Sequence, residues 1–324
     1  MLYLVPGGAG FIGSNIVEVL VNRGLRVRVL DNFSSGRRGN LAGFGDRIEV
    51  FEGDIRDYWT VTNAMEGVDI VLHQAALPSV ERSVDNPLTS NEVNINGTLN
   101  LLEAARRNKV RRFIYASSSS IYGNSSSVAR REEMKPEPLS PYAITKLAGE
   151  EYCITYHRLY GLETVCLRYF NVFGPRQNPG SQYAAVIPKF IMQLSRGDAP
   201  VIYGDGGQSR DFTYVSNVVE ANLLACESEG VAGQIMNVAC GTSFNLNQLA
   251  AMLNQIMGTN IKPKYAAPKP GDVRQSLAEI TKAQQLLGYH PEVNFHQGLR
   301  LTVEHLVNKV EKPALQTAIS ISGR

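Results

Sequence analysis

The sequence has few cysteines and no long apolar run, and its positive and negative charges nearly cancel. The cysteines, Cys153, Cys166, Cys226 and Cys240, are scattered without a Cys-x-x-Cys pair, which predicts reduced core residues and excludes a disulfide or zinc framework. No apolar run reaches the length of a membrane span and no signal peptide is recognisable, so we expect a cytoplasmic protein. Lys and Arg total 32 against 30 Asp and Glu, a balance that gives no reason to expect a nucleic-acid or membrane partner.

What the chain does contain is a regular alternation of short apolar segments and helical patterns. It has 324 residues, of which 44% are hydrophobic and 19% charged, enough for two globular domains or for one domain with a smaller lobe. We predict strands at residues 2–5, 26–30, 48–52, 68–72 and 112–116, and long helices at residues 91–108 and 142–160. This order is typical of an α/β fold, a Rossmann-like doubly wound parallel sheet.

A glycine motif follows the first predicted strand. Gly7, Gly10 and Gly13 are spaced as Gly-x-x-Gly-x-x-Gly before a helical pattern, and the second strand ends at Asp31. Glycines there allow a pyrophosphate to approach the backbone at a helix N-terminus, and Asp31 would bind ribose hydroxyls and repel a 2′-phosphate, which favours NAD over NADP. The alternatives are a βα turn without a ligand, and NADP bound with the help of the neighbouring residues Arg37 and Arg38.

Other polar residues follow the later strands. Asp54 either bonds the adenine amino group or caps the next helix. Asn94 either supports the cofactor pocket or packs, whereas the small Ala75 and Ala76 would let a dinucleotide lie against a strand end. We expect His73 to be a packed core residue and expect no metal site, because no second metal-type residue lies at a useful spacing from it.

Tyr142 and Lys146 are four residues apart, so on a helix they share one face. A lysine charge beside a tyrosine favours the phenolate and lowers the pKa of the phenol, which could then accept a proton from a hydroxyl. Upstream, the serines at residues 117–120 follow a strand, where ligands of doubly wound sheets bind; Ser118 is the preferred partner of Tyr142 and Ser119 the alternative. The plainer interpretations are a solvated helix face and a polar turn.

Together these motifs resemble the extended short-chain dehydrogenase/reductases, and more narrowly the NAD-dependent nucleotide-sugar 4-epimerases. Residues 168–177 (RYFNVFGPRQ), 203–212 (YGDGGQSRDF) and 269–274 (KPGDVR) resemble the phosphate-binding segment and two uridine-diphosphate clamps of that family. The resemblance implies a cofactor pocket formed by Gly7, Gly10, Phe11, Ile12, Gly13, Asp31, Asn32, Ser34, Ser35, Gly36, Asp54, Ile55, Gln74, Ala75, Ala76, Asn94, Tyr142, Lys146 and Tyr169. It implies a UDP-sugar site formed by Ser79, Ser118, Ser119, Tyr142, Asn171, Val186, Tyr203, Arg210, Asp272, Arg274 and Ser276.

The resemblance also implies a reaction and an organisation. We expect C4 epimerisation of UDP-hexoses through a 4-keto intermediate, with room for a 2-acetamido group if Ser276 limits the sugar pocket. Alternatives are a UDP-glucuronate 4-epimerase or decarboxylase, a dTDP- or GDP-sugar relative, or a non-catalytic NAD-sensing protein. Similar dehydratases carry an Asp-Glu pair where this chain has Ser119 and Ser120, which disfavours elimination.

The expected divisions are an NAD domain at residues 1–172 with a return segment at 212–241, a substrate lobe at 173–211 and 242–312, and a tail at 313–324. The resemblance implies a homodimer, because similar proteins commonly pair through two long helices, and the helices at 91–108 and 142–160 are the candidates. The family pattern usually has Asp where this chain has Asn217.

Overall fold

The computed structural model describes residues 1–124, 129–180, 184–268 and 274–307. Asp272 and the predicted tail at 313–324 therefore lie outside the described residues. A seven-stranded parallel sheet fills one half of the molecule, in the order β11-β6-β5-β4-β1-β2-β3. Its strands are β1 (Leu2–Pro6), β2 (Arg26–Asp31), β3 (Ile48–Glu52), β4 (Ile70–His73), β5 (Arg112–Ser118), β6 (Glu163–Tyr169) and β11 (Gln234–Val238). This confirms the predicted doubly wound α/β fold.

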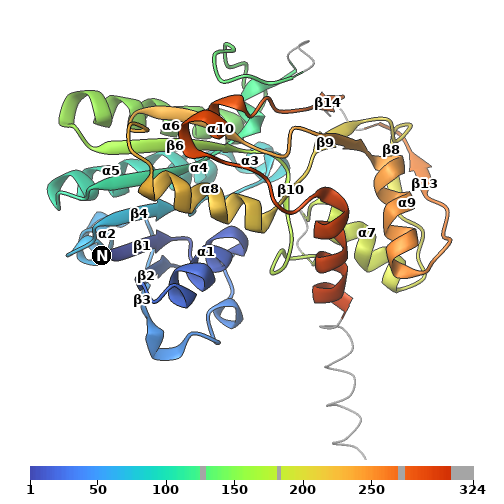
Figure 1. Cartoon of the computed structure of the whole chain (residues 1–324), viewed down its shortest axis with the longest axis horizontal. Helices are drawn as coiled ribbons and strands as arrows, with labels where there is room; N and C mark the ends of the chain where they lie inside the picture. The colour runs from blue at the N-terminus through green and yellow to red at the C-terminus, as the bar shows by residue number, and fades with distance from the viewer. Residues whose placement is uncertain (125–128, 181–183, 269–273, 308–324) are drawn as a thin grey trace, which may run out of the picture.

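Helices cover both faces of this sheet (Figure 1). One face carries α1 (Phe11–Asn22) and α8 (Val215–Glu227), and the other carries α2 (Tyr58–Met65), α5 (Gly97–Arg107) and α6 (Pro141–Tyr160). Each face has its own apolar core, with Ile16 and Val218 in the first and Leu101 and Cys153 in the second. Strands buried on both sides explain the continuous apolar runs in the sequence.

A smaller lobe lies beyond the carboxyl edge of the sheet, at the right of Figure 1. It contains α7 (Val186–Ser195), β8 (Val201–Tyr203), β9 (Ser209–Asp211), β12 (Ser243–Asn245), α9 (Leu246–Met257), β13 (Lys264–Ala266) and β14 (Gln275–Ser276). β7 (Val172–Phe173) pairs with β10 (Thr213–Tyr214) between the two parts, and residues 295–307 are helical. α10 (Thr281–Leu287) packs on α8 and β11, so this segment of the proposed substrate lobe lies against the large sheet.

The predicted single helix at 91–108 is wrong in its start and its regularity. The helical segment begins four residues earlier, with α4 (Pro87–Asn91), and passes through a π-helical turn, η3 (Glu92–Asn96), before α5. The Asn86 side chain accepts a bond from the Thr89 amide and Pro87 occupies the first turn, so a cap and a proline fix the earlier start. The Thr98 hydroxyl donates to the Asn94 carbonyl at 2.7 Å, at the point where the helical bonding pattern changes.

Two smaller expectations can be compared directly with the structure. All four cysteines are free, and Cys240 alone among them is partly exposed. His73 is buried and its Nε2 lies 2.9 Å from the Thr98 hydroxyl, which confirms a packed core histidine.

The Asn217 side chain, on α8, forms two hydrogen bonds with the backbone of Val293. These bonds hold the segment around Val293 against α8. Among the described helices, none combines the length and the apolar character that crossing a membrane requires.

Candidate active site

An open cavity of about 740 Å³ lies at the carboxyl ends of the sheet strands, between the sheet and the smaller lobe. Its volume is in the usual range for cofactor and ligand sites. Most of the predicted site residues line it: Gly7, Gly10, Phe11, Ile12, Gly13, Asp31, Asn32, Ser34, Ser35, Gly36, Asp54, Ile55, Gln74, Ala75, Ala76, Ser79, Ser118, Tyr142, Lys146, Tyr169 and Asn171. The described residues Asn94, Ser119, Val186, Tyr203, Arg210, Arg274 and Ser276 are not part of this lining.

The glycine loop has the shape that a pyrophosphate needs. Gly7 has a φ of +80°, and a methyl group on Gly13 would overlap the carbonyl oxygen of Gly7. Gly10 precedes α1, whose N-terminus has no side-chain cap, and the first-turn residues Phe11, Ile12 and Gly13 face the cavity. Uncapped first-turn N–H groups and the helix dipole favour an anion at this position, so these residues fit a dinucleotide.

Asp31 ends β2 and is buried at the cavity wall. Its carboxylate accepts hydrogen bonds from the Ala9 amide at 2.9 Å and from the Phe33 amide at 2.8 Å. Burial raises the pKa of Asp31, and the two backbone bonds oppose that rise. Because a carboxylate has about four acceptor sites, two remain for the hydroxyls of a ribose.

Arg37 and Arg38, the two arginines that could help to bind NADP, lie in different environments. Arg38 stacks on the Phe33 ring at 4.0 Å and pairs with Glu52 at 2.5 Å, which turns it away from the cavity lining. Arg37 lines the cavity. Of the two arginines, Arg37 therefore remains in a position to bind a 2′-phosphate, which the buried Asp31 carboxylate would repel.

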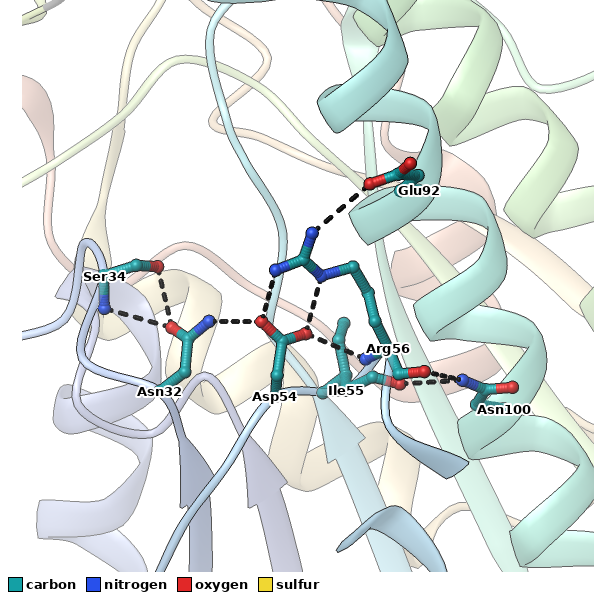
Figure 2. Close-up of polar contacts among 7 residues, drawn as sticks. All are labelled: Asn32, Ser34, Asp54, Ile55, Arg56, Glu92 and Asn100. Carbon is teal, nitrogen blue, oxygen red and sulfur yellow. Dashed lines mark hydrogen bonds and ion pairs between the residues drawn. The ribbon is translucent and has the colours of Figure 1, made fainter. Parts of the chain in front are cut away.

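Asp54 lies at the centre of the polar network in Figure 2. Its carboxylate accepts bonds from the Arg56 amide and guanidinium and from Asn32, at 2.8 to 3.0 Å, and Arg56 also pairs with Glu92 of η3. Hydrogen bonds from Arg56 lower the pKa of Asp54 to about 2. The capping alternative is wrong, because Asp57 is the residue that caps α2.

This bonding pattern affects the predicted role of Asp54. The bonds already fill about four acceptor positions, so Asp54 could bind an adenine amino group only by sharing or releasing one of them. A role at the adenine end of the cavity therefore stays a prediction. Sequence spacing could not show that Arg56 and Asn32 converge on this carboxylate.

Tyr142 and Ser118 meet at the opposite end of the cavity. The Ser118 hydroxyl is hydrogen-bonded to the amide and the hydroxyl of Ser120, at 3.2 and 3.0 Å, and Ser118 and Tyr142 both line the cavity. Ser119 begins the short helix η4 (Ser119–Tyr122) outside the lining, which makes Ser118 the better candidate of the two.

Lys146 lies one turn along α6 from Tyr142, as the spacing predicts, but its ammonium has a different partner. Its Nζ donates to the Ala116 carbonyl at 2.8 Å and lies 4.9 Å from the centre of the Tyr115 ring. Burial lowers the pKa of Lys146 to about 8. Burial raises the pKa of Tyr142, and the opposing effect comes from Ser118, so the expected lowering by Lys146 is not found.

The segments predicted to hold uridine diphosphate lie partly in the cavity. Asn171, with a φ of +35°, lines it and donates to the Asp211 carbonyl at 2.9 Å. Arg274 instead forms a doubly bonded pair with Asp205, at 2.7 and 2.9 Å, with both side chains mostly exposed. Ser276 is half-buried and pairs with Arg210 in the lobe sheet. The clamp roles of these residues stay predictions.

Two cations of the lining were missed as site residues. Arg176 follows the Asn171 motif and donates to the Ser14 carbonyl at 3.2 Å, so it belonged to a segment already singled out. Arg82 lies on α3 (Val80–Asp85), a short helix with no sequence motif. Its Ser79 cap has a φ of +124°, and the fold brings both residues to the cavity.

Several solved structures are similar to this chain over almost its whole length. A UDP-glucose 4-epimerase from Thermotoga maritima, solved with UDP-glucose, is 39% identical, with a TM-score of 0.91 over 96% of this chain and 100% of that chain. A UDP-N-acetylglucosamine 4-epimerase from Methanobrevibacter ruminantium, in complex with UDP-N-acetylmuramic acid, is 40% identical, with a TM-score of 0.91 over 95% and 98%. A UDP-glucose 4-epimerase from Thermus thermophilus, in complex with NAD, is 39% identical, with a TM-score of 0.87 over 94% and 98%.

A family model supplies the last observation. It matches residues 3–239, which run from the first strand of the large sheet to the segment just after its last strand. The chain belongs to the NAD dependent epimerase/dehydratase family, and its cofactor is NAD.

Proposed function

We propose that this protein is a UDP-sugar 4-epimerase that interconverts UDP-N-acetylglucosamine with UDP-N-acetylgalactosamine and UDP-glucose with UDP-galactose. The observation that carries the proposal is the Tyr142–Ser118 pair at the end of the cavity opposite Asp31 and Asp54. Those two aspartates are the only carboxylates among the described lining residues. An elimination would need an acid and a base near the sugar, so the lining favours epimerisation over dehydration. The names of the similar solved structures support the same class of substrate.

Each residue of the pair has a specific task. Tyr142 takes the proton of the sugar 4-hydroxyl, and Ser118 donates to the phenol oxygen and stabilises its charged form. Lys146, fixed by the Ala116 carbonyl, holds a positive charge on the same helix face. NAD supplies reversible hydride acceptance at C4. The uridine diphosphate would be held by Asn171 and by the clamp arginines Arg210 and Arg274 while the sugar turns.

A UDP-glucuronate 4-epimerase is the second candidate, and one observation favours it. Arg82 lines the cavity from α3, beside the helix that carries Tyr142. A guanidinium is suited to binding a sugar carboxylate through two parallel hydrogen bonds. A homodimer stays a prediction, with α5 and α6 as the candidate helices.

The test is incubation of the purified protein with UDP-glucose, UDP-galactose, both UDP-N-acetylhexosamines and UDP-glucuronate, followed by chromatographic separation of the products. Tyr142→Phe should lower kcat by roughly 10²- to 10⁴-fold, the usual contribution of a general base. Tyr160→Phe, at the exposed end of the same helix, is the matched control and should leave kcat unchanged. Near-normal turnover by Tyr142→Phe would contradict the assignment of the base, and no turnover of any sugar by the unmodified protein would favour a non-catalytic role.

A further inference from the structure

The end of strand β5 is joined to helix α6 at two consecutive residues, directly before Ser118. The Ala116 carbonyl accepts from Lys146 Nζ at 2.8 Å, and the Ser117 hydroxyl donates to Glu150 Oε1 at 2.5 Å. Ser118, the next residue, lines the cavity together with Tyr142. Tyr142, Lys146 and Glu150 are spaced four residues apart and lie on one face of α6. Two consecutive hydrogen bonds thus fix the strand end to the helix directly before Ser118.

A glycine allows this close contact. A methyl group on Gly149 would lie 3.0 Å from a ring carbon of Tyr115 and closer still to its hydroxyl. The Tyr115 side chain of β5 therefore packs directly on the helix backbone at Gly149. Ser117, two residues along β5, reaches the helix through the longer Glu150 side chain.

Glu150 is held rigidly from the other side. Its carboxylate accepts two bonds from Arg168, at 2.9 Å to Oε1 and 2.8 Å to Oε2, and the two side chains are 1% and 3% exposed. Arg168 lies on β6 directly opposite Ser117 in the sheet register, and its remaining nitrogen donates to the Tyr122 hydroxyl at 2.8 Å. Separating a buried ion pair is strongly unfavourable, so the acceptor of Ser117 has one fixed position.

We propose that Ser117 and Glu150 are positioning residues, which hold the end of β5 so that the Ser118 hydroxyl stays directed at Tyr142. Neither needs to touch the substrate for this role. Ser118 follows Ser117 directly in the chain, so rotation of that strand end would turn the Ser118 hydroxyl away from Tyr142. The proposal rests on the proposed function through one point, that Tyr142 is the base.

Ser117→Ala tests the proposal, because it removes one contact and leaves the Glu150–Arg168 pair intact. We expect kcat to fall by about 10-fold, which is the usual effect of one hydrogen bond to a charged group, with KM unchanged. The acid limb of the kcat–pH profile should move to higher pH, since the Ser118 bond that favours the phenolate is loosened.

The matched control is Thr164→Val. The Thr164 hydroxyl is also buried and also bonds α6, donating to the Cys153 carbonyl at 2.8 Å, but near the other end of the helix. Thr164→Val should lower the melting temperature by about as much as Ser117→Ala does, and it should leave kcat and the kcat–pH profile unchanged. Ser117→Thr, which keeps the hydroxyl, should restore both.

Titration of the Tyr142 phenol in the NAD-loaded protein gives a readout that does not depend on turnover. The ultraviolet difference between each variant and the same variant with Tyr142→Phe isolates this tyrosine, and Ser117→Ala should raise its apparent pKa. The proposal is overturned if Ser117→Ala shifts neither titration nor pH profile beyond Thr164→Val, or if Ser117→Thr behaves like Ser117→Ala. If the protein turns over no UDP-sugar, the proposed function fails, while the titration still decides whether Ser117 positions Tyr142.

Discussion

The glycine loop gives a test of the cofactor site that needs no substrate. In Gly13→Ala the new methyl carbon would overlap the Gly7 carbonyl oxygen and lie 2.9 Å from the Gly7 carbonyl carbon and from the Gly8 Cα. All three are backbone atoms, so relief requires the loop itself to move. Overpacking of this kind costs about 1–3 kcal/mol, and the displaced loop is the part that receives the pyrophosphate.

The expected shifts follow from the size of the chain. An unfolding entropy of about 2.1 cal/mol/K per residue gives roughly 0.7 kcal/mol/K for a chain of this length, so a loss of about 2 kcal/mol lowers the melting temperature by about 3 °C. NAD at about 100 times its dissociation constant stabilises the native protein by about 2.7 kcal/mol, or about 4 °C. Without NAD, Gly13→Ala should therefore unfold about 3 °C below the unmodified protein. Added NAD should raise the melting temperature of the unmodified protein by about 4 °C and leave that of Gly13→Ala unchanged.

The measurement is thermal unfolding of protein stripped of cofactor, with and without added NAD. Gly43→Ala is the matched control, because no atom lies within 4 Å of the place its new methyl group would take and its backbone is not left-handed. That variant should keep the full response to NAD. If Gly13→Ala showed the same NAD-dependent shift as Gly43→Ala, the pyrophosphate would not lie on this loop.

Two further predictions concern the substrate lobe. Ser276→Tyr should abolish activity on the two acetylated UDP-sugars and spare UDP-glucose and UDP-galactose, because an aromatic ring would fill the space for the acetamido group; equal loss of kcat/KM on both pairs would show that Ser276 does not limit the pocket. Asp205→Asn should tighten UDP binding by up to about 5-fold in calorimetric titration, since it frees Arg274 from an exposed ion pair whose own contribution is small. Weaker UDP binding by that variant would mean that Asp205 orients the clamp.

The order of strands and helices could be predicted because buried strands and amphipathic helices leave different periodicities. The extension of β5 to Ser118 could not, since a run of serines carries no apolar signal, although the strand pairs with β6 through its last residue. The π-helical turn could not be predicted from the sequence either. Asn94, within that turn, bonds Leu77 and Thr145, which lie far away in the sequence.

The site residues also fall into those that the sequence could predict and those that it could not. Residues that a motif fixes within one βα unit, such as Gly13 and Asp31, lie in the cavity as the sequence predicts. Residues whose place depends on the packing of separate elements do not follow from spacing. Arg82 enters the lining from a short helix, and Arg274 turns to Asp205, because both positions are set by neighbours distant in the chain.

The ionisation of Tyr142 shows what spacing alone leaves out. A lysine four residues along a helix suggests a lowered pKa, but that inference ignores the cost of burying the phenolate. In the described residues, burial raises the pKa of Tyr142 and the Ser118 hydrogen bond is the contact that lowers it. Lys146 has its own burial cost, so it keeps its charge below a pH of about 8 and loses it above. Ser118 is thus the residue that opposes the burial cost at Tyr142, so under the proposed function the residues that fix Ser118 would affect the base.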